Sequence, residues 1–449
     1  MPHRRRSPGR FAGLAAIPDA VAREHPREQA DVIIAGDGII ALAAGVALRS
    51  SLGEEARIVM LAPPAPRGQG VDPRAYAIAS SVRHMLETLG VWRAVENAAQ
   101  PMKRIIVTDS RLDDAVRPAF LSFLGEAGAN EDGGSEAFAH MIEAQALRDA
   151  LLYAAEAARI EKVASRLDAL GLDSEGDRIL VRAEAERIIA ASLLVAADGA
   201  RSVCRELAGI AWIGWDYPQL GLTTTIGHER EHDGRAYEHF LPGGPFAILP
   251  LKGRRSSIVW AEDKHEAKRL LSLAEAEVLT EIARRFGHEL GDLRLEGRLI
   301  GFPLGFGIAR AFAGKRLALV GDAAHVIHPV AGQGLNLGLQ DVAALAEAVS
   351  EAAHLGLDPG NPHTLSSYER ARRFDTTVMG ALTDGLVRLF SNDFLPLRAL
   401  RDIGLSLVDR APVVKRFLAA KAGGQNEIRS SRSSFGPATR LSSDSNNRV

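Results

Sequence analysis

The chain has 449 residues, of which 46% are hydrophobic and 24% are charged, and its formal net charge at pH 7 is −2. These values are typical of a globular protein long enough for two lobes, and they give no global reason to expect nucleic-acid binding. The single cysteine, Cys204, excludes an intramolecular disulfide and a cysteine-cluster metal site. We therefore expect a cytoplasmic protein without a metal centre.

Both ends of the chain are predicted to be disordered. The first 30 residues begin with an Arg-rich run and then alternate charge with Ala, Pro and Gly, which fits either a disordered extension or an upstream start. An organelle transit peptide fits less well, because Asp19, Glu24 and Glu28 are out of place in such a segment. Residues 425–449 are rich in Ser, Arg and Asn and are predicted to form a solvated tail.

A strand, a glycine-rich turn and a helix open the folded part of the chain. Residues 31–35 are apolar and predict a strand, and a helix running to about Ser50 follows the turn Gly36-Asp37-Gly38-Ile39-Ile40-Ala41. A second strand at residues 57–61 completes a βαβ unit. This G-x-G-x-x-A pattern indicates a Rossmann-like dinucleotide site, with Gly36, Gly38 and Ala41 as candidate cofactor-binding residues.

Two features of this unit depart from the usual fingerprint. Asp37 places a carboxylate inside a loop that normally receives a pyrophosphate, which costs affinity unless the side chain points away. The acidic residue expected at the end of the second strand, to hold a ribose, is absent, and Ala62 stands there instead. The sequence therefore leaves open how tightly the adenosine half of a cofactor is held.

The next segments are predicted to pass between the cofactor domain and a second lobe. Residues 72–78 are predicted to open a helix toward Trp92, and residues 103–109 are predicted to form a strand that leaves the cofactor domain. Residues 110–140, loose and rich in Gly and acidic residues, fit an excursion into the second lobe. An Ala- and Leu-rich helix that ends near Ala158 follows.

A second strand-to-turn signal lies at Leu193–Arg205. The apolar run 193–197 leads into Asp198-Gly199-Ala200-Arg201-Ser202-Val203-Cys204-Arg205. A plain Asp-Gly turn would require neither the preceding strand nor Ser and Arg at these spacings. Cys204 is predicted to be a small packed residue, because no histidine adjoins it in the sequence.

The pattern between residues 220 and 260 changes to that of β-strands. Pro- and Gly-containing turns separate four runs, at 220–226, 236–241, 246–249 and 256–260. An antiparallel sheet between two parts of a nucleotide-binding fold suits a substrate lobe that covers the cofactor. Tyr237 and His239 could act on a phenol there, although a strand Tyr or His is more often structural.

The strongest motif runs from Leu317 to Asp341. A buried-strand run at 317–320 turns through Gly321-Asp322-Ala323-Ala324-His325, a Pro- and Gly-rich loop follows, and an apolar-periodic helix is predicted to start near Leu335. Glycines let a backbone approach a ligand closely, and the free amides of a helix N-terminus favour negative charge. Asp322 is a poor phosphate ligand but a good acceptor for sugar or polyol hydroxyls.

Taken in this order, the three motifs resemble those of the aromatic-ring flavoprotein hydroxylases related to para-hydroxybenzoate hydroxylase, the class A flavoprotein monooxygenases. The most similar branch is the ubiquinone-biosynthesis FAD-dependent hydroxylases, and the resemblance covers about residues 31–424. It implies an α/β fold in which a Rossmann-like, discontinuous FAD-binding domain carries a β-rich substrate domain and C-terminal helices. The boundaries we predict are 1–30 (extension), 31–109, 141–210 and 301–360 (FAD-binding domain), 110–140 (excursion), 211–300 (substrate domain), 361–424 (helical region) and 425–449 (tail).

The same resemblance implies roles for individual residues. The motif's Asp, here Asp322, binds the ribityl chain of the flavin, and Arg74 and Arg148 match polar residues beside the flavin. A surface arginine is the alternative for Arg74, and an i,i+4 surface pair is the alternative for Arg148. The remaining candidate cofactor-binding residues implied by the match are Asp198, Gly199, Gly321, Ala323, Pro329, Gly332, Gln333, Gly334 and Asn336.

In that family NAD(P)H reduces FAD, oxygen adds at C4a of the flavin, and the distal oxygen is transferred to an activated phenol ring. The implied substrate is a polyprenyl phenol or quinol intermediate. Two alternatives stay open: a flavin-dependent prenyl-group reductase or epoxidase, and a flavin-poor accessory subunit of a quinone-biosynthesis complex. Asp37 and Ala62 are the only support for the second alternative.

The C-terminal helical region offers a possible site of peripheral contact with the inner face of the membrane. Residues 403–421 mix Leu, Val and Phe with basic residues, as an amphipathic element on an anionic membrane surface does. A helix packed on the domain or on a dimer partner explains the same pattern. The sequence therefore predicts a cytoplasmic location and leaves membrane contact as a hypothesis.

Overall fold

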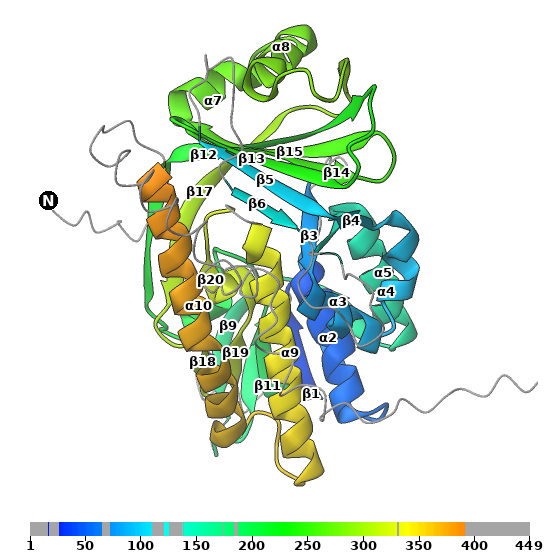
Figure 1. The fold of residues 1–449 in the computed structure, drawn as a ribbon. Helices are drawn as coiled ribbons and strands as arrows, with labels where there is room; N and C mark the ends of the chain where they lie inside the picture. The colour runs from blue at the N-terminus through cyan, green and yellow to red at the C-terminus, as the bar shows by residue number, and fades with distance from the viewer. Residues whose placement is uncertain are drawn as a thin grey trace, which may run out of the picture.

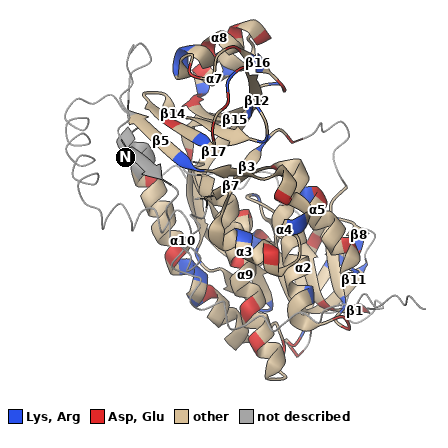
Figure 2. Ribbon diagram, turned by 45° about the vertical axis from the view of Figure 1, so that its right-hand side comes forward, with Lys and Arg blue, Asp and Glu red and all other residues tan. Residues whose placement is uncertain are grey.

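The computed structural model describes residues 17, 27–64, 72–109, 121–124, 137, 139–173, 175–183, 187–329 and 332–390. Within these residues three sheets of eight, nine and three strands organise the molecule. The eight-stranded sheet forms the lower lobe and the nine-stranded sheet the upper one, with the three-stranded sheet between them (Figure 1). Charged residues cluster on the outer helices, whereas the strands are mostly uncharged (Figure 2).

The eight-stranded sheet has parallel strands at its centre. β1 pairs in parallel with β2 and β11, and β11 pairs in parallel with β19, so distant parts of the chain meet in one sheet. β2 and β11 are buried at every position, as expected for strands covered on both faces. The strands are β1 (Arg27–Ala35), β2 (Ile58–Ala62), β8 (Glu161–Ala164), β9 (Leu167–Leu172), β10 (Ile179–Ala183), β11 (Ile188–Ala196), β18 (Ala313–Gly314) and β19 (Leu317–Leu319). The discontinuous α/β domain expected from the sequence is confirmed.

Helices from three parts of the chain cover this sheet. α2 and α9 lie against each other on one side, and α10 packs on α9 (Figure 1). The helix expected near Leu335 begins two residues earlier, at Gln333. The helices are α2 (Ile39–Leu52), α3 (Ser80–Thr88), α4 (Trp92–Val95), α5 (Ala144–Ala157), α6 (Val203–Leu207), α9 (Gln333–His354) and α10 (Pro362–Phe390), with short 3-10 turns η1 (Glu96–Ala98) and η3 (Gly321–Ala323).

The three-stranded sheet corrects one prediction from the sequence. Residues 72–78 were expected to open a helix, but β3 (Ala75–Ala79) pairs antiparallel with β7 (Ala139–Glu143), and helix begins only at Ser80. β4 (Gln100–Met102) completes the sheet on the other side of β7. Alanine is a strong helix former, but intrinsic propensity is a small effect, and the pairing of this segment with β7 overrides it.

The nine-stranded sheet confirms the antiparallel sheet expected between residues 220 and 260. Its strands are β5 (Arg104–Asp109), β6 (Leu121–Leu124), β12 (Trp212–His228), β13 (Arg235–Leu241), β14 (Gly244–Leu251), β15 (Arg255–Asp263), β16 (Leu293–Leu295), β17 (Ile300–Ala309) and β20 (His325–Val326). β5 joins it by parallel pairing with β13. Helices α7 (Lys264–Leu271) and α8 (Glu275–Phe286) cover its outer face (Figure 1).

The structure describes part of the predicted N-terminal extension but none of the predicted C-terminal tail. β1 begins at Arg27, so the predicted disordered extension is wrong for residues 27–30, which pair with β11. Ile17 is also buried, and its backbone N–H donates to the Leu170 carbonyl at 3.1 Å. The amphipathic element at 403–421 and the tail at 425–449 lie outside the described residues. Within the part of the chain that the structure describes, every helix is too short or too polar to cross a membrane.

Candidate active site

Two helix N-termini meet at one glycine turn. Gly38 caps α2, Gly332 caps α9 in a left-handed conformation, and η3 lies between the two helices. A Cβ on Gly338 would lie 2.8 Å from Cδ1 of Ile40 and 3.0 Å from Cα of Gly321, so this close approach requires glycine. Both helices therefore pack close to the η3 turn near their starts, where free backbone amides favour an anionic ligand.

Several glycines are not needed by the fold itself. Gly38 has an ordinary extended conformation, and a Cβ on Gly38 or Gly334 would meet nothing within 4 Å. Gly36 differs, because a Cβ there would collide with the carbonyl of Ala197. The backbone at Gly38 and Gly334 therefore borders open space, as close approach of a cofactor requires. This open backbone fits the expected flavin nucleotide.

Asp322 lies in the η3 turn, between the strand β19 and the helix α9. Its side chain is exposed to solvent, yet protein atoms surround it closely enough that burial raises the pKa of its carboxyl, against the charges of His325 and Arg74. A side chain that is both accessible and crowded is typical of an open concave site. The carboxylate is thus placed to accept hydrogen bonds from a bound polyol.

Arg74 lies beside Asp322, as the sequence analysis expects. Its Nε donates to Oδ1 of Asp72 at 2.9 Å, its Nη2 donates to Oδ2 at 2.7 Å, and its guanidinium lies 5.8 Å from the ring centre of Tyr76. The hydrogen bonds to Asp72, with further attraction from Asp322, raise the pKa of Arg74. The structure therefore brings a fixed positive charge from before β3 next to the turn after β19.

Arg148 neutralises the carboxylate that looked out of place in the first glycine loop. From α5 its Nη1 donates to the carbonyl of Asp37 at 2.7 Å, and its Nη2 donates to Oδ2 of Asp37 at 3.2 Å. Both side chains are about one-third exposed, so this pair borders solvent rather than the core. The objection that Asp37 repels a pyrophosphate is weakened, because its charge has a partner.

The Asp198-to-Arg205 turn is joined to the η3 turn by a hydrogen bond. Oδ2 of Asp198 accepts from the backbone N–H of Cys204 at 3.0 Å, while its Oδ1 is buried without a partner among the described residues. A buried carboxylate oxygen of this kind is normally satisfied by a ligand or water. Arg205 donates to the carbonyl of Ala323 at 2.8 Å and so ties this turn to η3. Cys204 is fully buried, and burial raises the pKa of its thiol, which confirms a packed residue.

Asn336 holds protein backbone rather than facing an open cleft. Its Oδ1 accepts from the N–H of Ala79 at 3.0 Å, and its Nδ2 donates to the carbonyls of Ala77 at 2.8 Å and Gly332 at 3.2 Å. These bonds fix β3 against the N-terminus of α9. Gln333 is buried at the first turn of that helix, while Pro329 precedes two residues outside the described ones.

Sequence reasoning missed the residues that support the η3 turn from behind. Asp341 is fully buried on α9; its Oδ2 accepts from the N–H of Gly321 at 3.0 Å and lies 2.6 Å from Nε2 of His325. Its Oδ1 accepts from Nε of Arg372 at 2.9 Å. Burial alone would raise the pKa of Asp341, but His325 and Arg372 hold it below its ordinary value. An aspartate in an otherwise apolar helix face was the available signal.

The two catalytic candidates from the sequence, Tyr237 and His239, lie on the face of the upper sheet that α7 and α8 cover. Tyr237 and His239 contact Phe286 of α8, with ring centres 5.2 Å and 6.0 Å apart. Nδ1 of His239 also lies 2.6 Å from Oγ1 of Thr108. Both rings therefore face the outer helices rather than the cofactor domain, and the structure gives no support to a catalytic role for either residue.

The opposite face of the sheet carries an aromatic patch that the sequence did not reveal. Tyr217 and Phe240 pack there with Leu304. The hydroxyl of Tyr217 donates to Oδ1 of Asp384 on α10 at 2.6 Å, and its ring lies edge-on to His328 at 5.2 Å. Burial lowers the pKa of His328 to about 4, so this imidazole is neutral at physiological pH. This patch faces the cofactor domain and suits an aromatic substrate.

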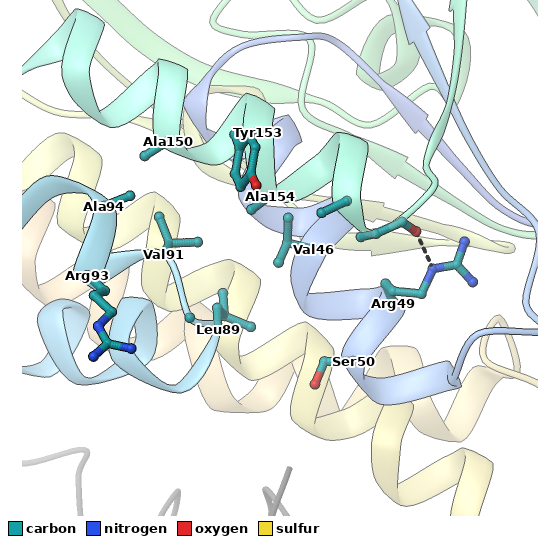
Figure 3. A pocket seen from close by; sticks show the side chains of 13 residues that line it. Val46, Arg49, Ser50, Leu89, Val91, Arg93, Ala94, Ala150, Tyr153 and Ala154 are labelled. Atoms are coloured by element: carbon teal, nitrogen blue, oxygen red, sulfur yellow. Dashed lines mark hydrogen bonds between the residues drawn. The ribbon is translucent and has the colours of Figure 1, made fainter. Parts of the chain in front are cut away.

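A separate apolar groove lies on the outside of the lower lobe. It has a volume of about 580 Å³ and runs between α2, α4 and α5, with Tyr153 and Val46 on its walls (Figure 3). Its lining comes from the outward sides of these helices, away from the glycine turns. The groove therefore forms no part of the candidate active site.

Comparisons with known proteins agree with this geometry. A family model described as "FAD binding domain" matches residues 29–379. The chain is 40% identical over 403 residues to the ubiquinone hydroxylase UbiL of Rhodospirillum rubrum, covering 88% of this chain and 90% of that protein. It is 32% identical over 393 residues to the 3-demethoxyubiquinol 3-hydroxylase of Escherichia coli, covering 86% and 96%.

A solved structure with a similar fold is p-nitrophenol 4-monooxygenase PnpA from Pseudomonas putida. It superposes with a TM-score of 0.70 at 19% identity and covers 89% of this chain and 99% of that one. At this identity the likeness concerns the fold alone, whereas the family match and the sequence relatives span most of the chain. The chain belongs to the FAD-binding domain family, and within it to the ubiquinone-biosynthesis hydroxylases of the class A flavoprotein monooxygenase type.

Proposed function

We propose that this protein is an FAD-dependent monooxygenase that hydroxylates the aromatic ring of a polyprenyl phenol intermediate in ubiquinone biosynthesis, with NAD(P)H as electron donor. The observation that carries the proposal is the meeting of two helix N-termini and the accessible Asp322 carboxylate at one open glycine turn. Relatives named as ubiquinone hydroxylases support the substrate class. The aromatic patch around Tyr217 and Phe240 supports a ring-shaped substrate.

We assign the cofactor contacts by combining the motif match with the geometry. When bound, FAD supplies the redox chemistry and the activation of oxygen. Asp322 would accept the ribityl hydroxyls, and the open backbone at Gly38 and the N-terminus of α2 would take the pyrophosphate. The other proposed contacts are Gly36, Ala41, Arg74, Arg148, Asp198, Gly199, Gly321, Ala323, Pro329, Gly332, Gln333 and Gly334. Asn336 acts on this proposal by positioning β3 rather than by contact.

The protein's own contribution is positioning, charge and exclusion of water. The N-terminus of α9 carries partial positive charge, which would favour the negative charge of a bound flavin. Arg74 adds a full positive charge beside Asp322. The face of the upper sheet that carries Phe240 and Leu304 is apolar, which would limit the access of water to the reaction.

The accessory-subunit alternative loses half of its support. Asp37 is paired with Arg148 and no longer argues against cofactor binding. Ala62 still ends β2 without an acid for the ribose, so this contact would have to come from backbone groups. No specific observation favours the reductase or epoxidase alternative, and we retain the hydroxylase.

We further propose peripheral contact with the inner face of the membrane, and membership of a quinone-biosynthesis complex. A polyprenyl tail has to reach the site from an apolar phase. Exposed apolar side chains support such a contact: Ile213 and Trp215 on β12, and Phe374 and Leu382 on α10. Trp215 stacks on Phe306 with ring centres 4.5 Å apart.

An absorbance scan of the purified protein tests the proposal first, with FAD titration if the protein is colourless. We expect bound or tightly titrating flavin, and NAD(P)H oxidation that a prenylphenol stimulates. Failure to bind FAD at high concentration would replace catalysis with the accessory role. Flavin binding without any stimulation by prenylphenols would instead contradict the substrate class.

A further inference from the structure

Glu238 is a carboxylate on the cofactor-facing side of the upper sheet. Side chains alternate along β13, and Tyr237 and Leu241 belong to the apolar cluster under α7 and α8. Ala236 and Phe240 belong to clusters on the opposite face. Glu238 lies between these two in the strand and shares their face, so it points toward the cofactor domain.

Along this face, Glu238 lies between the start of α9 and the aromatic patch around Tyr217 and Phe240. Ala236, two residues before it, packs in a cluster that includes Ala77 of β3. Ala77 lies next to Gly332, the N-cap of α9, because a Cβ built on Gly332 would lie 3.7 Å from the Cβ of Ala77. Phe240, two residues after it, packs with Tyr217 in the aromatic patch. A substrate ring held between the flavin and that patch would pass close to Glu238.

The surroundings of Glu238 are apolar and give it no partner. Its neighbours across the sheet are Val107 on β5 and Ala247 on β14. Among the described residues no side chain or backbone group forms a hydrogen bond or ion pair with its carboxyl. By contrast, Glu262 in the same sheet accepts from Nε1 of Trp260 at 3.2 Å and pairs with Arg285 at 3.4 Å. The side chain is only partly buried, so a ligand can reach the carboxyl and supply the missing hydrogen bonds.

Burial by itself raises the pKa of Glu238 to about 7. No charged group contributes noticeably to this shift. The ionisable groups toward the two ends of the face include the Arg255–Glu143 ion pair on the β7 side, and Tyr217, His328 and Asp384 on the α10 side. A carboxyl of this kind changes between its two protonation states near neutral pH, as a general base requires.

We propose that Glu238 binds the ring hydroxyl of the phenol or quinol substrate and accepts its proton. The O–H bond of the hydroxyl breaks, the proton passes to a carboxylate oxygen of Glu238, and the ring oxygen is left as a phenolate. No electron changes hands in this step. The phenolate directs electron density into the ring, which prepares a ring carbon to receive oxygen. This inference rests on the proposed hydroxylase function.

The test compares wild-type holoenzyme with Glu238→Gln, using a 2-prenylphenol and its O-methyl ether as probes. Binding is followed by the change in flavin absorbance, and turnover by probe-dependent NAD(P)H oxidation, both across a pH range centred on 7. We expect kcat/KM of Glu238→Gln with the phenol to fall about 100-fold at pH 8. The acidic limb of the wild-type pH profile should disappear in this variant.

Two controls separate a chemical role from a structural one. Tyr237→Phe alters the neighbouring side chain on the opposite face, and we expect it to keep the wild-type pH profile. In the wild-type enzyme the methyl ether has no proton to give, so its binding should be independent of pH while binding of the phenol is not. This second comparison requires no variant and holds even if Glu238→Gln folds poorly.

The outcomes distinguish the two proposals. A wild-type enzyme that the phenol stimulates, together with a Glu238→Gln variant of unchanged rate and pH profile, would overturn the role of Glu238 alone. Equal pH dependence of phenol and methyl-ether binding would overturn it as well. A wild-type holoenzyme that the phenol does not stimulate at any pH would overturn the hydroxylase function, and the role of Glu238 with it.

Discussion

The two lobes hold carboxylates that protein atoms surround, Asp341 and Glu238, in opposite ways. In the lower lobe, Asp341 is fully buried and meets Gly321, His325 and Arg372, and these contacts hold its pKa below the ordinary value. In the upper lobe, Glu238 has no partner among the described residues, and burial raises its pKa to about 7. Asp341 is kept charged by its protein partners, whereas Glu238 is free to change its protonation state near neutral pH.

This difference separates a structural charge from a functional one. A buried charge with several partners fixes geometry, and here Asp341 fixes the turn that carries Asp322. A buried group without partners reduces stability, which a fold tolerates where a ligand later makes the missing contacts. Removing the charge of Asp341 should therefore lower the stability of the fold. Removing the charge of Glu238 should raise the stability and lower the activity.

Removing the charge of Asp341 should have the largest effect. Asp341→Asn leaves Arg372 without its charged partner in the interior, and we expect a loss of about 3–5 kcal/mol in the free energy of unfolding at pH 7. Because the folded-state pKa of Asp341 is lowered, its contribution is present above the unfolded value, about 4, and is lost as pH falls through the folded pKa. Urea unfolding at pH 7 and under acid measures both effects. A variant as stable as wild type at pH 7 would show that Asp341 is not the anchor of the turn.

Removing the charge of Glu238 should increase the free energy of unfolding at pH 8. The folded-state pKa is raised, so ionising Glu238 above that pKa costs stability, and Glu238→Gln should stabilise the protein at pH 8 by up to about 3 kcal/mol. Below the unfolded pKa, about 4, both states carry a neutral group and the gain should vanish. Thermal unfolding of wild type and variant at pH 8 and at low pH tests this. Destabilisation at pH 8 would mean that the carboxylate has a partner.

Sequence reasoning recovered the parts of the site in which residue type is dictated by the backbone. Gly36, Gly321 and Gly332 occupy positions where a side chain would collide or the backbone is left-handed, so these motifs could be recognised as strings. Asp322 could be recognised because it stands within such a string. The α/β organisation followed from strand-and-turn patterns for the same reason.

The rest depended on contacts between residues far apart in the sequence. No local pattern tells that Arg148 on α5 reaches Asp37, or that Asp341 has hydrogen-bond partners on η3, β20 and α10. The sequence does not tell which side chains of β13 face the covering helices and which face the cofactor domain. For this reason it suggests Tyr237 and His239 as candidates and not Glu238. The strand at 75–79 was missed because its partner β7 follows a long intervening segment.

The open backbone at Gly38 offers a way to separate cofactor binding from folding. A Cβ there meets no protein atom, so Gly38→Ala should fold normally but weaken FAD binding at least about 10-fold, or about 1.4 kcal/mol, by obstructing the pyrophosphate. Gly297→Ala is a matched control, since Gly297 has equally open space but lies in the upper lobe. FAD titration followed by flavin fluorescence measures both variants. Equal affinity in the two would place the cofactor away from this loop.

The smallest expected effect concerns the pair of Arg148 and Asp37, which borders solvent. Arg148→Met should weaken FAD binding by about 1 kcal/mol, because it leaves the Asp37 carboxylate unpaired beside the pyrophosphate. Adding Asp37→Asn to this variant should restore most of the loss, since the repulsive charge is then gone. If Arg148 instead contacts the flavin directly, the double variant should bind as weakly as Arg148→Met alone. FAD titration of the two single variants and the double variant, at low and high salt, therefore decides whether Arg148 neutralises a charge of the protein or holds the cofactor itself.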